Sequence, residues 1–218
     1  MSSRVTITID KQEITAEKGE KLLWTALENG IYIPNLCAVK GKSRSSASCR
    51  LCFVEVEGIS RPVTACTQPV SEGMVVKTRS PEVDRLVKTA FELLISDHRL
   101  GCSKCASNRS CELQKIAKAR GLKFKLTRFK PFEKEVPIDE SAASFIIDRS
   151  RCVLCGRCVW VDQQVVKVGA IGFSRRGIKR RVTTFGDKPI ADSPCNECGE
   201  CVKVCPVGAL SFKEQTNA

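Results

Sequence analysis

The chain has 218 residues, 14 cysteines and a formal net charge of +12, which is enough for one or two modest domains. The first ten residues have no apolar core of a signal peptide, and no apolar run approaches the length of a membrane span. These features argue against secretion and membrane insertion, so we expect a cytoplasmic protein whose thiols stay reduced.

Fourteen cysteines are compatible with either a disulfide framework or metal sites. Several of them recur at every third residue. Thiols so near to one another in the chain are better suited to ligating one metal centre than to forming disulfides. If all of them ligate four iron–sulfur cores, the net charge falls to roughly +6. The basic runs 115–130 and 175–181 are then a solvated face or a docking surface for an acidic protein. Nucleic acid is the alternative partner, although no recognised nucleic-acid module accompanies these runs.

Residues 1–79 predict a β-grasp ferredoxin domain. Alternating apolar residues indicate strands at 4–9 and 13–15, with a helix at 20–29 after them. Three further strands are expected, at residues 52–57, 62–65 and 74–78. The order strand, strand, helix and then more strands is typical of this fold.

Four cysteines of this domain are spaced C-x11-C-x2-C-x13-C: Cys37, Cys49, Cys52 and Cys66. The plant-type ferredoxin spacing has a shorter first gap. The chemistry is the same, because each iron of a [2Fe–2S] core needs two thiolates. The loop 41–48 contains Gly, Ser and Ala, whose small side chains would let the loop wrap closely around the cluster and donate backbone N–H groups to its sulfurs. An all-thiolate zinc site is the alternative.

Residues 80–120 predict a small helical domain with a second cluster. Ser80 and Pro81 are the preferred N-cap and first residue of a helix, and an apolar face follows. The helix leads to one imidazole and three thiolates: His98, Cys102, Cys105 and Cys111. A lone histidine is usually structural, but here the position four residues before a C-x2-C favours ligation of a [4Fe–4S] cluster. A neutral imidazole ligand should raise the potential of that cluster.

After a linker at 121–143, residues 144–218 predict a two-cluster ferredoxin domain. The second of its two cysteine runs is a C-x2-C-x2-C-x3-C-P pattern, whose fourth cysteine ligates the partner cluster. Segments 169–173 and 208–212 follow the two runs at matching places and indicate an internal repeat. The gap between the runs predicts an inserted hairpin through residues 175–187. One [4Fe–4S] cluster is therefore assigned to Cys152, Cys155, Cys158 and Cys205.

The remaining triplet, Cys195, Cys198 and Cys201, lacks a fourth cysteine, because Asp162 stands where one is expected. Carboxylate binds Fe–S iron less well than thiolate. The outcomes are an Asp-ligated [4Fe–4S] cluster, a [3Fe–4S] cluster, or an empty site with Asp162 on the surface. Unligated clustered thiols are an oxidation liability, so we hypothesise that a cluster is present.

These ligand sets, in this order, resemble one family over essentially the whole chain. It is the N-terminal electron-transfer module shared by the complex I large iron–sulfur subunit, [FeFe]-hydrogenases and the small diaphorase subunit of NAD-reducing hydrogenases. The chain ends thirteen residues after Cys205, which leaves no room for a hydrogen-activating or molybdopterin domain. The nearest match is therefore the stand-alone diaphorase-type subunit of NAD(P)-linked hydrogenases, formate dehydrogenases and electron-bifurcating complexes.

The resemblance implies an α+β protein with a β-grasp [2Fe–2S] domain, a helical [4Fe–4S] domain and a two-cluster ferredoxin domain. It implies a subunit that carries electrons from a flavin-containing NAD(P)H-oxidising subunit, with its small iron–sulfur partner, to a catalytic subunit or ferredoxin. The sequence has no nucleotide-binding fingerprint, so no substrate site is expected in this chain. The alternatives are a zinc-stabilised module that binds nucleic acid and a reductase with its own flavin.

Overall fold

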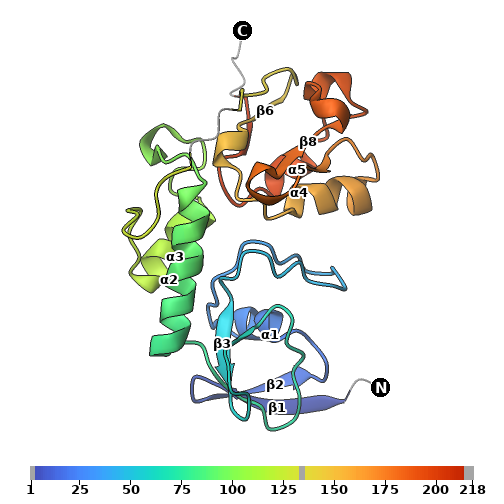
Figure 1. Cartoon of the computed structure of the whole chain (residues 1–218). Helices are drawn as coiled ribbons and strands as arrows, with labels where there is room; N and C mark the ends of the chain where they lie inside the picture. Colours follow the sequence, from blue (N-terminus) through green and yellow to red (C-terminus); the bar gives the residue numbers. More distant parts are fainter. Residues whose placement is uncertain (1–2, 133–135, 214–218) are drawn as a thin grey trace. The chain divides into compact units, whose positions relative to one another are not determined.

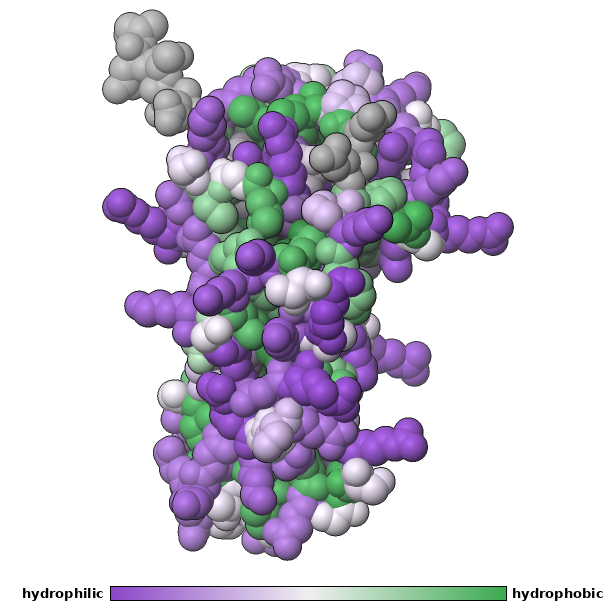
Figure 2. Space-filling model, turned by 60° about the vertical axis from the view of Figure 1, so that its left-hand side comes forward, coloured by the Kyte–Doolittle hydropathy of each residue, from purple (hydrophilic) through white to green (hydrophobic). Residues whose placement is uncertain are grey.

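The computed structural model describes residues 3–132 and 136–213 (Figure 1). The chain divides into two units, one ending at Leu93 and one beginning at Leu94, and each is described by itself. Among the described residues, no helix is long and apolar enough to cross a bilayer. Hydrophilic side chains cover much of the face drawn in Figure 2.

The first unit is built on a five-stranded sheet with the order β2-β1-β5-β3-β4. β1 (Arg4–Ile9) and β2 (Gln12–Glu17) form a hairpin whose two turn residues, Asp10 and Lys11, both have positive φ, as a tight hairpin turn requires. β5 (Val75–Lys77) pairs parallel with β1 and antiparallel with β3 (Phe53–Val56). β4 (Val63–Thr64) completes the sheet.

One helix packs against this sheet and contributes to the hydrophobic core of the first unit. α1 (Leu22–Glu28) buries Leu22, Leu23 and Ala26 against the sheet residues, which include Ile7, Ile9 and Val76. Burying each large aliphatic side chain contributes about 1.5–3 kcal/mol. The expected order of strands and helix is thereby confirmed, with the helix two residues shorter at its start and one at its end than the sequence predicted.

The helical segment begins with α2 (Pro81–Ser96), which crosses the division between the units. The Ser80 hydroxyl accepts the N–H of Val83 at 3.2 Å, so the expected N-cap is present. A 3-10 turn at Cys102–Lys104 and α3 (Glu112–Arg120) follow. Within the second unit, α3 is tied to the ferredoxin-like part by the Glu112 N–H, which donates to the Pro206 carbonyl at 2.9 Å.

The ferredoxin-like part holds two small sheets and two short helices. β6 (Phe145–Ile147) pairs antiparallel with β9 (Leu210–Phe212), and β7 (Gly172–Ser174) with β8 (Arg181–Thr183). The β7–β8 pair frames the hairpin that the long gap between the cysteine runs predicted. α4 (Arg157–Trp160) continues as a π-helix (Val161–Val166), and α5 (Glu200–Lys203) follows the second run. Further 3-10 turns lie at Arg149–Arg151, Gly177–Lys179, Phe185–Asp187 and Ile190–Asp192.

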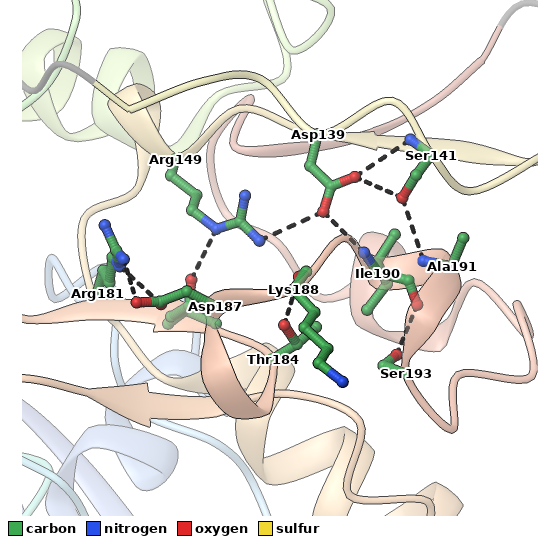
Figure 3. Close-up of polar contacts among 11 residues, drawn as sticks. Asp139, Ser141, Arg149, Arg181, Thr184, Asp187, Lys188, Ile190, Ala191 and Ser193 are labelled. Carbon is green, nitrogen blue, oxygen red and sulfur yellow. Dashed lines mark hydrogen bonds and ion pairs between the residues drawn. The ribbon is translucent and has the colours of Figure 1, made fainter.

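A buried polar network fixes this insertion to the rest of the unit (Figure 3). Asp139 forms an ion pair with Arg149 at 3.4 Å and accepts the Ile190 N–H at 2.9 Å. The Arg149 Nε in turn donates to the Val182 carbonyl at 3.1 Å. Because the charges of this pair are mutually satisfied and hydrogen-bonded, their burial is tolerated. The network holds the segment that leads into the first cysteine run.

Candidate metal centres

The four cysteines of the first unit lie together in its interior. They come from the loop after α1, the start of β3 and the end of β4, and each is at most 6% exposed. The sulfurs of Cys37 and Cys49 are 3.5 Å apart, and Cys52 and Cys66 form a second hydrogen-bonded pair. Two thiolates on one tetrahedral metal, with bonds of about 2.3 Å, are roughly 3.8 Å apart. The two pairs therefore fit a core that needs two thiolates per iron.

The loop before Cys49 stabilises negative charge on this site. A hydrogen bond with Cys49 lowers the pKa of Cys37, and the backbone N–H groups of Cys49 and Ser48 lower it further. The hydrogen bond with Cys37 raises the pKa of Cys49, and burial raises it further. Ala47 and Arg50 adopt left-handed backbone conformations on either side of this segment. The lowered pKa of Cys37 agrees with the predicted donation of loop N–H groups to sulfur.

The only histidine lies just beyond the end of α2, and its ring is oriented by the backbone. His98 Nδ1 is 2.8 Å from the carbonyl oxygen of Arg151. A carbonyl can only accept, so Nδ1 carries the proton and Nε2 keeps the lone pair. Metal-binding histidines have this arrangement, in which the second ring nitrogen donates to a carbonyl. His98 is therefore prepared to ligate through Nε2.

The three cysteines after His98 are neighbours of one another. Burial raises the pKa of Cys111, and the negative charges of Cys105 and Cys102 raise it further. All three are partly buried. They lie on the 3-10 turn, directly after it and directly before α3, so one short segment supplies three thiols a few residues after His98 in the sequence.

The predicted ligands of the third cluster, in the ferredoxin-like part, all border one pocket. One pocket with an almost entirely apolar lining is bordered by the four predicted ligands together with aliphatic side chains such as Ile171 and Leu210. The four are Cys152, Cys155, Cys158 and Cys205. Burial raises the pKa of Cys155 to about 12, and the neighbouring thiolates Cys152 and Cys205 add to the effect. Four thiols around a dry pocket fit a cluster, because cluster iron provides the positive charge that stabilises four buried thiolates.

The second cysteine run is folded like the first. Leu154 and Glu197, the residues two after the first cysteine of each run, both have φ near +54°, and each N–H lies 3.4 Å from that cysteine's sulfur. The following glycines, Gly156 and Gly199, are left-handed in both loops. The second loop thus retains the cluster-binding conformation of the first although its fourth ligand is not a cysteine.

Each loop is also covered by a phenylalanine from the repeated segment. A Cβ on Gly156 would lie 3.1 Å from the Phe173 ring, and one on Gly199 would lie 2.8 Å from the Phe212 ring. A Cβ at either position would press on the ring, and both glycines have a positive φ that other residues rarely adopt. The matching segments 169–173 and 208–212 signalled this repeat in the sequence, whereas the covering role of the two rings was missed.

Asp162 lies where the internal repeat requires a fourth ligand. It is 9% exposed, within the π-helix, and its Oδ2 accepts the Ile171 N–H at 3.1 Å. In the other half of the repeat, the equivalent N–H of Leu210 hydrogen-bonds the sulfur of Cys205. The carboxylate of Asp162 thus receives the hydrogen bond that the sulfur of Cys205 receives in the other half.

Asp162 is also electrostatically coupled to the incomplete triplet. Burial raises the pKa of Cys201 to about 11, and the negative charges of Cys195, Cys198 and Asp162 raise it further. The pKa of Cys195 is raised by burial, with a smaller contribution from Asp162. The structure thereby brings the aspartate to the cysteines with which the sequence grouped it. Over the described residues, no set of three or more His, Cys, Asp or Glu side chains is placed to hold a single metal ion.

Three family models match successive parts of the chain. Residues 2–81 match a "2Fe-2S iron-sulfur cluster binding domain". Residues 88–124 match an "NADH-ubiquinone oxidoreductase-G iron-sulfur binding region", and residues 144–211 match an "NADH-quinone oxidoreductase subunit 3, ferredoxin-like domain". The chain therefore contains a 2Fe–2S domain followed by 4Fe–4S-binding regions.

Similar proteins are named as subunits of a hydrogenase and of another oxidoreductase. The NADP-reducing hydrogenase subunit HndD of Solidesulfovibrio fructosivorans is 36% identical over 95% of this chain. The NADPH-Fe(3+) oxidoreductase subunit alpha of Geobacter sulfurreducens is 36% identical over 96%. The chain spans 36% and 24% of the lengths of these two relatives.

A solved structure matches over nearly the full length of both chains. It is a chain of an NAD+-reducing [NiFe]-hydrogenase in the H2-reduced state, with a TM-score of 0.86 and 32% sequence identity. The match covers 97% of this chain and 88% of the hydrogenase chain. The likeness therefore covers nearly the whole chain, including all three matched regions.

Proposed function

We propose that this chain, which belongs to the family of small diaphorase-type iron–sulfur subunits of NAD(P)-linked hydrogenases and related complexes, conducts electrons through four iron–sulfur clusters. The observation that carries the proposal is the dry pocket bordered by Cys152, Cys155, Cys158 and Cys205. The paired buried thiols of the first unit and the carbonyl-oriented His98 support it. When bound, each cluster takes up and releases one electron at a time.

The residues of the chain then have three tasks. The aliphatic lining of the pocket keeps water from the sulfurs, which strengthens every electrostatic effect on the cluster. Backbone N–H groups, such as those of Leu154 and Glu197, stabilise negative charge on sulfur. The choice of ligand, three cysteines with His98 or with Asp162, sets the clusters at different potentials.

Electrons enter from a flavin-containing NAD(P)H-oxidising subunit with a small iron–sulfur partner and leave to a catalytic subunit or to ferredoxin in the cytoplasm. The name of one relative, an NADPH-Fe(3+) oxidoreductase, supports this direction of flow. The name of another, an NADP-reducing hydrogenase, supports conduction through the same chain toward the nucleotide. The lack of a nucleotide-binding fingerprint in the sequence supports a chain that conducts but does not itself oxidise the nucleotide.

The test uses the anaerobically purified holo chain and its visible absorbance. NADH or NADPH alone should leave the absorbance unchanged, whereas addition of the flavin-containing subunit from the same organism should bleach it. A holo chain that NAD(P)H reduces by itself, with stoichiometric bound flavin, would establish the self-contained reductase instead. A colourless zinc protein would establish the binding module.

We further propose that Asp162 ligates the cluster held by Cys195, Cys198 and Cys201. The preserved loop conformation and the hydrogen bond from Ile171 support direct ligation. Replacing Asp162 with cysteine should change the EPR signal of one centre only, and replacing it with alanine should remove about one iron per chain. If neither substitution changes the spectrum or the iron content, Asp162 is not a ligand.

A further inference from the structure

We propose that Arg151 sets the reduction potential of the cluster at His98 and Cys105 and fixes the orientation of its imidazole ligand. The inference rests on the proposed function, since it requires a cluster at that site. Arg151 is the last residue of the 3-10 turn Arg149–Arg151 and directly precedes Cys152, a proposed ligand of a different cluster.

The backbone of Arg151 makes the first contact. Its carbonyl oxygen lies 2.8 Å from His98 Nδ1. That hydrogen bond defines which nitrogen of the ring carries the proton, and it makes the ligating Nε2 more electron-rich. Cys152, a proposed ligand of the cluster in the apolar pocket, is the next residue. The peptide that orients the proposed ligand His98 of one cluster therefore leads directly into a proposed ligand of another.

The side chain of Arg151 makes the second contact. Its Nε donates to Asp148 Oδ2 at 2.8 Å. Although burial lowers it, the pKa of Arg151 is raised overall, because Asp148 and the nearby Cys105 favour the charged guanidinium. A Cβ built on Gly208 would lie 2.4 Å from Cys105 Sγ and 3.8 Å from Arg151 Cδ, so the Cys105 sulfur and the stem of the Arg151 side chain approach the same point of the backbone. The Arg151 side chain is only 12% exposed, so solvent screens its charge weakly.

A cation at a ligand sulfur favours the more negative, reduced state of the cluster. The effect is large where the charge is partly buried and hydrogen-bonded to sulfur. Asp148, the partner of Arg151 in the ion pair, has the opposite effect on the potential because it is negatively charged. Its carboxylate also accepts hydrogen bonds from the backbone N–H and the side chain of Ser150. The two members of the pair should therefore shift the potential in opposite directions.

The experiment is an EPR-monitored redox titration of the holo chain. The signal of this cluster is identified by its change in the His98→Cys variant. Arg151→Gln should move its midpoint potential to a more negative value, and Arg151→Lys, which keeps the charge, should move it less. Asp148→Asn keeps the side-chain acceptor of the turn but removes the negative charge, so it should move the midpoint to a more positive value.

The matched control is Arg149→Gln, in the same turn. Arg149 is equally buried, but its partners are Asp139 and the Val182 carbonyl (Figure 3), so the midpoint at His98 should stay at its wild-type value. Equal shifts in the Arg149 and Arg151 variants, or the same sign for Arg151→Gln and Asp148→Asn, would show a structural role only and overturn the inference. If the Arg151→Gln variant does not retain the cluster, the midpoint potentials of the Arg151→Lys and Asp148→Asn variants still test the inference. Absence of iron in the wild-type chain would instead reject the proposed function.

Discussion

Gly208 gives the sharpest steric test of how the second unit is assembled. It follows Cys205 by three residues, yet a Cβ added to it would lie 2.4 Å from the sulfur of Cys105. Normal non-bonded contacts are about 3.5–4.0 Å, so Gly208→Ala requires a displacement of more than about 1 Å. Its φ lies outside the left-handed region, and the cost is therefore steric. Overpacking of this kind costs about 1–3 kcal/mol.

For a chain of this length, each kcal/mol lowers Tm by about 2–4 °C, so Gly208→Ala should lower the apparent Tm of the holo chain by roughly 2–12 °C. The assay is anaerobic thermal unfolding at one fixed scan rate, with iron content measured before each scan. Gly172→Ala is the matched control, because its Cβ meets only Gln163 Nε2 at 3.7 Å, an ordinary contact. If both variants unfold at the same temperature, Cys105 does not lie against Gly208 and the packing argument is refuted.

Three further predictions concern the individual centres. His98→Cys should lower the potential of one four-iron cluster, because an anionic thiolate replaces a neutral imidazole; a redox titration that finds the same midpoint contradicts ligation. Cys37→Ser should remove only the two-iron signal, since that cysteine lies in the other unit; loss of a four-iron signal would contradict the assignment. Phe212→Ser should speed iron release in air from the cluster beside Gly199, and an unchanged rate would show that the ring does not protect it.

Local patterns were sufficient for the order of the elements in the first unit, and they grouped four cysteines that the structure brings together around one apolar pocket. Period-two and helical patterns gave the strand and helix order of the first unit, and cysteine spacing placed Asp162 beside the second triplet before any contact was known. Such inferences succeed because hydrophobic periodicity and ligand spacing are properties of short segments. The π-helix at Val161–Val166 has no comparable signal and was not predicted.

Contacts between distant segments could not be predicted in the same way. The carbonyl that orients His98 belongs to Arg151, 53 residues away, and the sulfur of Cys105 meets the backbone of Gly208. Both depend on how α3 and the ferredoxin-like part pack, for which a single sequence carries no pattern. A histidine near a C-x2-C predicts a ligand, but its hydrogen-bond partner is visible only in the fold.

The central claim, that the chain holds four iron–sulfur clusters, is tested most directly by counting iron, sulfide and zinc per chain after anaerobic purification. The four proposed clusters contain roughly 13–14 irons and about 14 sulfides, and no stoichiometric zinc is expected. A count of roughly 10 irons would mean that the site at Asp162 holds no cluster, while the other three clusters would still conduct electrons. Stoichiometric zinc with little iron would contradict the account as a whole.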